Sequence, residues 1–129
     1  MPETIPFSER SQGAQVLLAL VVPFIFGAIV GVVLGASAGV YWILSAIAAV
    51  GAVLAGLEHP DPRSAAIRGL VIGAVYGIAV LLAHAVAGTH AEVSLGSFPP
   101  IVILIDAVAG AILAAIGGLI SRAKVGRTA

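Results

Sequence analysis

The sequence predicts an all-α, polytopic membrane protein built as one bundle of four transmembrane helices. Hydrophobic residues make up 60% of the 129 residues and charged residues only 9%, whereas a soluble domain carries about 25% charged residues. Six basic and six acidic side chains are too few to cover the surface of a soluble protein of this length. The lipid bilayer is therefore the first partner that we expect.

Long uncharged runs separated by polar connections locate the four spans. No charged side chain lies between Ala14 and Leu57, and one helix needs only about 20 residues to cross the hydrocarbon core, so this run must hold two spans. The glycine-rich stretch 35–39 is the expected turn between them. The loop 58–63 contains two prolines and ends the second span, and the polar stretch 88–97 separates the third span from the fourth. We expect spans at about 14–36, 39–57, 65–87 and 99–121, forming a single transmembrane domain over 14–121, with an N-terminal cytoplasmic segment at 1–13 and a basic cytoplasmic tail at 122–129.

The basic residues predict the orientation of the bundle. Four spans bring both termini and the middle loop to one side, and every basic residue of the chain falls on that side. Because cytoplasmic loops carry an excess of Lys and Arg, we expect both termini to be cytoplasmic, in a prokaryotic inner membrane. The basic residues are Arg10, Arg63, Arg68, Arg122, Lys124 and Arg127.

Small residues at a four-residue spacing predict where the helices pack. Lipid removes the hydrophobic drive for association, so membrane helices rely on close contact between small residues. We expect a Gly/Ala-packed bundle in which each helix presents one face of small residues. We assign three groups of glycines to this packing: Gly27, Gly31, Gly35 and Gly39, which recur from the first span into the start of the second; Gly69, Gly73 and Gly77 in the third span; and Gly110 and Gly117 in the fourth.

One acid and one histidine are the candidates for chemistry inside the spans. Asp106 lies about two turns into the fourth span and shares a helix face with Gly110 and Gly117. An ionisable group at such a depth usually faces the bundle interior or a water-filled cavity. His84 lies near the outer end of the third span, at a similar expected depth. The two side chains form either a buried hydrogen-bonded pair that fixes helix register or a pair that handles protons or cations.

Other functional classes find little support in the sequence. The chain has no cysteine and no net charge, which argues against thiolate metal sites and against nucleic-acid binding. Phosphate-binding loops, nucleophile motifs and compact metal-ligand spacings are missing, so we expect no enzymatic activity, cofactor or metal. The charged residues between Glu58 and Arg68 are expected to form a solvated cluster at the lipid headgroups.

Two functions remain. The first is a non-catalytic accessory or scaffold subunit, or a self-associating helix-packing module, and the scarcity of polar residues in the spans favours it because permeation needs a polar lining. The alternative is a homo-oligomeric small transporter or channel for protons or cations that uses an outer-side pair of Asp106 and His84. In either case we expect a homo-oligomer or a larger membrane complex.

Overall fold

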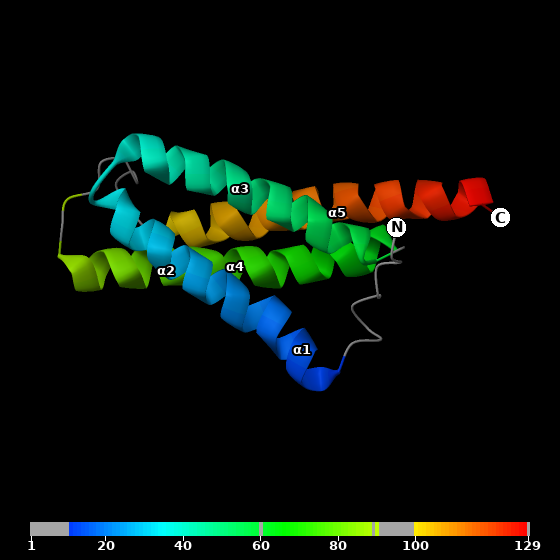
Figure 1. The fold of residues 1–129 in the computed structure, drawn as a ribbon, viewed down its shortest axis with the longest axis horizontal. Helices are drawn as coiled ribbons and strands as arrows, with labels where there is room; N and C mark the ends of the chain where they lie inside the picture. Colours follow the sequence, from blue (N-terminus) through cyan, green and yellow to red (C-terminus); the bar gives the residue numbers. More distant parts are fainter. Residues whose placement is uncertain (1–10, 60, 89, 91–99, 129) are drawn as a thin grey trace.

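A computed structural model of the protein describes residues 11–59, 61–88, 90 and 100–128, and in these residues every regular element is helical. The sequence prediction of an all-helical chain with four helical segments long and apolar enough to cross a membrane is confirmed. Most of the N-terminal segment 1–13 and of the connection 88–97 lies outside the described residues. The elements, drawn in Figure 1, are α1 (Gln12–Val16), the π-helical turn η2 (Leu17–Val21), α2 (Val22–Leu34), α3 (Ala38–Leu57), α4 (Pro62–Ala87) and α5 (Ile101–Thr128).

Local side-chain chemistry explains where these helices begin and end. The hydroxyl of Ser37 accepts a hydrogen bond from the backbone N–H of Val40 at 3.2 Å and so caps α3. Asp61 caps α4 with its carboxylate, and Pro62 suits the first helical position, where no N–H is needed. The C-cap of α4 is Gly88, whose φ of 68° lies in the left-handed region that glycine adopts without strain.

Helix boundaries differ from the predicted spans at two places. α4 begins at Pro62 rather than near residue 65, because Asp61 caps the helix at that point. α5 continues to Thr128 rather than ending near Ser121. Basic residues occupy this last part of α5, and cations near a helix C-terminus interact favourably with the helix dipole.

The first helical segment is not a continuous α-helix. In η2 the N–H of Val22 donates to the carbonyl of Leu17, five residues earlier, and the next residue, Pro23, has no N–H to donate. Such π turns interrupt the regular hydrogen-bond ladder of a helix. The interruption separates α2, which packs on α4, from α1, which extends away from the other helices (Figure 1).

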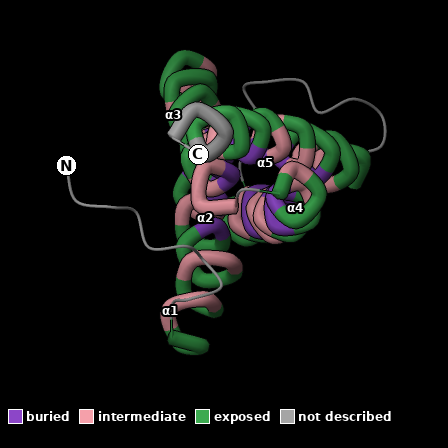
Figure 2. The backbone as a smooth tube through the Cα atoms, turned by 90° about the vertical axis from the view of Figure 1, so that its right-hand side faces the viewer, coloured by how far each residue is buried: buried purple, intermediate pink, exposed green. Residues whose placement is uncertain are grey.

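α4 and α5 run side by side with their backbones in direct contact. A Cβ atom placed on Gly73 would overlap the backbone of Asp106, and one placed on Gly69 would overlap that of Gly110. Gly77 faces the next turn of α5 in the same way. Buried residues, purple in Figure 2, lie on α4, on the parts of α5 beside it and on α2. Only residues without a side chain allow two helices to approach this closely.

The two remaining segments attach to different members of this pair. Gly27 and Gly31 of α2 lie against α4, where their Cβ atoms would meet backbone carbonyls. Gly56 of α3 lies against α5 at Ala114, and Gly117 of α5 lies against α3. α2 and α3 therefore have few contacts with each other, although they are neighbours in the sequence.

Gly35 and Gly39 do not continue the glycine stripe of the first span, contrary to the prediction. Gly35 is the C-cap of α2. Gly39 is exposed in the first turn of α3, where an added Cβ would meet only the hydroxyl of Ser37 at 3.9 Å. The four-residue spacing continues in the sequence, but the helix ends at Leu34, so the last two glycines face other directions.

Many large apolar side chains lie on the outside of the bundle, and few are fully buried. In the described residues the largest fully buried side chains are Leu34, Val30 and Val80. Many Leu, Ile and Val residues on all four segments are exposed, as is Trp42. The tight contacts inside the bundle are therefore made by glycine and alanine, and the outer surface is apolar.

We predict that Gly73→Ala destabilises the protein by about 1–3 kcal/mol, because the new methyl group would overlap the backbone of α5, which cannot move aside as a side chain can. Unfolding by denaturant in detergent micelles, followed by circular dichroism, measures the change. Gly51→Ala is the matched control, since nothing lies within 4 Å of its Cβ position. Equal stability of the two variants would contradict the close contact at Gly73.

Candidate functional site

A cavity of about 450 Å³ lies between α2, α3, α4 and α5. One face of α3 lines it from Tyr41 near one end of the helix to Glu58 just beyond the other. The helix rises about 25 Å between these two residues, which is close to the roughly 30 Å thickness of a hydrocarbon core. The middle of this face consists of the small residues Ala48, Ala52 and Ala55. The cavity exists because α2 packs on α4 while α3 packs on α5, so that nothing fills the space between them.

The cavity opens sideways between the first segment and α3. Val22 on one side and Ile47 and Leu54 on the other line the cavity, and their exposed fractions are 47%, 53% and 56%. Residues that both line a cavity and reach the outer surface mark its opening. An apolar molecule can therefore enter from the side of the bundle.

Polar side chains from three helices meet at the Tyr41 end of the cavity. Tyr41 and Ser45 come from α3, Tyr76 from α4 and Asp106 from α5, and all four line the cavity. The hydroxyl of Ser45 donates to the backbone carbonyl of Tyr41 at 2.8 Å, and the ring of Tyr76 stacks on Phe26 of α2 with 6.1 Å between centroids. We call these five residues the Asp106 cluster.

Asp106 is the charged member of this cluster. Its carboxylate lies beside Gly77, with Oδ2 3.1 Å from the position of an added Cβ. Within the described residues no hydrogen bond or ion pair of its carboxylate is found. The small face of α4 thus leaves room for the carboxylate, and that carboxylate is open to whatever enters the cavity.

Asp106 and His84 are not joined in the structure, although the sequence suggested a pair. His84 lies about two turns of α4 beyond Gly77, or about 10 Å of helix, and in the described part of the chain no hydrogen bond or ion pair links it to Asp106. Its Nδ1 is buried without a hydrogen-bond partner there. The glycine contacts set the register of α4 against α5, and this register places Asp106 opposite Gly73 and Gly77 rather than opposite His84.

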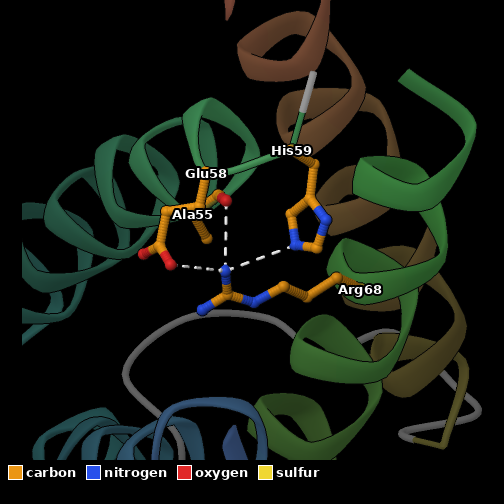
Figure 3. A network of polar contacts seen from close by, with 4 residues as sticks. All are labelled: Ala55, Glu58, His59 and Arg68. Atoms are coloured by element: carbon orange, nitrogen blue, oxygen red, sulfur yellow. Dashed lines mark hydrogen bonds and ion pairs between the residues drawn. The ribbon is translucent and has the colours of Figure 1, made fainter. Parts of the chain in front are cut away.

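The other end of the cavity holds a compact polar network around Arg68 (Figure 3). Nη1 of Arg68 donates to the carbonyl of Ala55 at 3.2 Å, lies 3.3 Å from Oε2 of Glu58 and 3.5 Å from Nε2 of His59. The carbonyls in the last turn of a helix lack partners within the helix and carry its negative dipole end. Arg68 therefore ties α4 to the C-terminal end of α3 and is neutralised by Glu58.

The prediction of a solvated charge cluster between Glu58 and Arg68 was wrong for Arg68, which is only 8% exposed. One feature of the sequence indicates this burial: Arg68 lies more than a turn inside α4, directly before Gly69 on its contact face. Asp61 and Arg63 are exposed, as predicted for the loop.

His59 is the titratable group most affected by this network. Partial burial lowers the pKa of His59 below its ordinary value, and the positive charge of Arg68 lowers it further. The pKa of Asp61 is also lowered, chiefly because its carboxylate accepts a hydrogen bond from the backbone N–H of Arg63. Near neutral pH, therefore, His59 is uncharged and Asp61 is ionised.

The comparisons add no relative: no family model, curated protein or solved structure matches this chain. In the described residues there is no group of three or more His, Asp or Glu side chains that could hold a metal ion. The cavity and its two polar ends are therefore the features that point to a function.

We predict that Glu58→Gln lowers stability by roughly 2–3 kcal/mol, because it leaves the charge of Arg68 buried without its counter-ion. The free energy of unfolding in detergent measures this change. Arg63→Gln, at an exposed position, is the control and should have little effect. The double variant Glu58→Gln, Arg68→Met should recover part of the loss. No recovery would mean that Glu58 acts independently of Arg68.

The lowered pKa of His59 predicts a pH dependence of stability. Because the unfolded chain takes up a proton near the ordinary histidine pKa of about 6.5 while the folded chain resists it, stabilisation is complete above this pH and is lost as the pH falls below it. Unfolding measured from pH 7.5 to 5 should show this decline, and the decline should be smaller in His59→Gln. An unchanged pH profile in that variant would contradict the assignment.

Proposed function

We propose that the protein is a small, non-catalytic transporter or channel for protons or cations, which acts from a homo-oligomer and uses Asp106 in its cavity. The observation that carries this proposal is the cavity itself, which brings Asp106, Tyr41, Ser45 and Tyr76 together on a path lined by one whole face of α3. The sequence alone favoured an accessory subunit because polar residues in the spans are scarce. Since these few polar groups converge on one space, their scarcity no longer argues against a pathway.

Integral insertion in a membrane is part of this proposal. Four helical segments have the length and hydropathy of membrane spans, and their outer faces expose large apolar side chains, which suits lipid better than water. Because all basic residues fall in segments that four spans bring to one side of the membrane, the positive-inside rule supports cytoplasmic termini in a prokaryotic inner membrane. The glycine contacts of α4 support a Gly/Ala-packed bundle.

Asp106 is the residue on which transport would depend. A carboxylate within a span is costly unless water, a proton or a cation compensates its charge. The Asp106 cluster offers hydroxyl groups beside this carboxylate, and the cavity continues toward the Glu58 and Arg68 network at the basic end. A proton or cation bound at Asp106 could therefore be released toward either end. His84 has no role in this proposal.

A second candidate function is the accessory or scaffold subunit. The observation in its favour is the lateral opening of the cavity along α3, flanked by Val22 and Leu54. A groove of small residues along one helix can accept a transmembrane helix of a partner. In that case Asp106 and Arg68 would bind polar groups of the partner.

We expect the purified protein in liposomes to conduct protons when a membrane potential is applied, and Asp106→Asn to reduce this flux at least tenfold. An internal pH-sensitive dye reports the flux. His84→Gln is the matched control and should retain most of it, because His84 does not contact Asp106. The transport proposal fails if the wild-type protein does not exceed empty liposomes for protons or monovalent cations, or if Asp106→Asn is as active as the wild type. Native mass spectrometry that then finds the chain bound to larger subunits would favour the accessory function.

A further inference from the structure

We propose that the Asp106 cluster is a binding site for an apolar organic cation. This inference rests on the proposed function and names the class of ligand that the site would take. Three features of the cavity support an organic cation as the ligand: the charge of Asp106, the aromatic rings that line the cavity with Asp106, and the lateral opening.

The charge of the cavity is negative at the Asp106 end. Arg68 at the opposite end is neutralised by Glu58 at 3.3 Å, and His59 beside it is uncharged near neutral pH. No described basic side chain bonds the carboxylate of Asp106. A charge in a span is normally paired, so a cation is the complementary ligand.

Aromatic rings make this site suited to an organic cation rather than to a metal ion. Phe26, Tyr41 and Tyr76 line the same cavity as Asp106, from three different helices. The face of an aromatic ring attracts a weakly hydrated cation. A metal ion such as Ca²⁺ needs about six to eight oxygen ligands, whereas the Asp106 cluster has one carboxylate and three hydroxyl groups.

The rest of the cavity fits the apolar body of such a ligand. Between the Asp106 cluster and the Arg68 network its wall consists of small and apolar residues, among them Ala48, Ala52 and Leu113. The cavity volume of about 450 Å³ is in the range of small-molecule pockets. Since Val22 and Leu54 line it and are also exposed, the ligand can enter sideways from lipid without passing the polar ends.

Two probes of the same shape and opposite charge test this inference. Tetraphenylphosphonium and tetraphenylborate are titrated separately by calorimetry into the protein in nanodiscs of zwitterionic lipid, and the signal of empty nanodiscs is subtracted. We expect saturable binding of the phosphonium ion and at least tenfold weaker binding of the borate ion. Equal binding of both ions, or no saturable binding of the phosphonium ion, would overturn the inference.

Substitutions locate the site. Asp106→Asn keeps the size of the side chain and should weaken phosphonium binding at least tenfold, and Tyr41→Leu should weaken it about threefold or more. Phe24→Leu is the matched aromatic control: Phe24 is exposed and does not line the cavity, so binding should be unchanged. Unchanged binding in Asp106→Asn, or an equal loss in Phe24→Leu, would place the ligand elsewhere and overturn the inference.

The outcomes separate this inference from the proposed transport function. Asp106-dependent proton flux without phosphonium binding would support transport and refute the organic cation site. Phosphonium binding that depends on Asp106, without any flux, would support the site and refute transport. A partner protein captured in native membranes by a photo-cross-linking residue placed at Ala48 would show that a helix occupies the cavity. This outcome would refute both the transport function and the organic cation site.

Discussion

The close contact between the backbones of α4 and α5 is the constraint on which the rest of the structure depends. Gly69 and Gly73 leave no space for a side chain between the two helices, so the pair has one register. α2 then packs on α4 through Gly27 and Gly31, and α3 packs on α5. Because the two outer segments follow different helices, they diverge, and the cavity is the space that they leave. The position of glycines in four helices therefore creates the candidate site.

The two polar ends of the cavity differ in how their charged groups are compensated. Arg68 is surrounded by a carboxylate, a helix carbonyl and an imidazole, all supplied by residues 55–59. This network compensates the charge internally and fastens α4 to α3, which is a structural role. Asp106 has no such compensation within the described residues. A half-buried carboxylate that the fold leaves unbonded at an open cavity is suited to bind something from outside.

Much of the fold could be predicted from the sequence, because uncharged runs and polar loops determine the number of helices and the positions of their turns. The interior position of Asp106 also followed from its spacing with Gly110. The pair with His84 did not, because depth was counted from the helix ends and not from the register that Gly73 and Gly77 impose. The cavity was out of reach of sequence reasoning, since it depends on which helix each segment packs against. Arg68 was missed because a charge near a loop was assumed to be solvated.

The N-terminal part of the first segment, α1 and η2, is the part of the cavity wall that the other helices hold least, because none of its residues is buried. α4 and α5 are held by several backbone contacts, and α3 is held both by Gly56 against α5 and by the Arg68 network. α2 is attached through Gly27 and Gly31 and through the fully buried Val30 and Leu34, whereas the π turn before Pro23 interrupts the hydrogen-bond ladder of the segment. A movement of α1 and η2 at this turn would widen or close the lateral opening, which Val22 flanks, and leave the α4–α5 pair intact. Access to Asp106 would then be controlled by the one wall of the cavity that no polar contact fastens to α3 in the described residues.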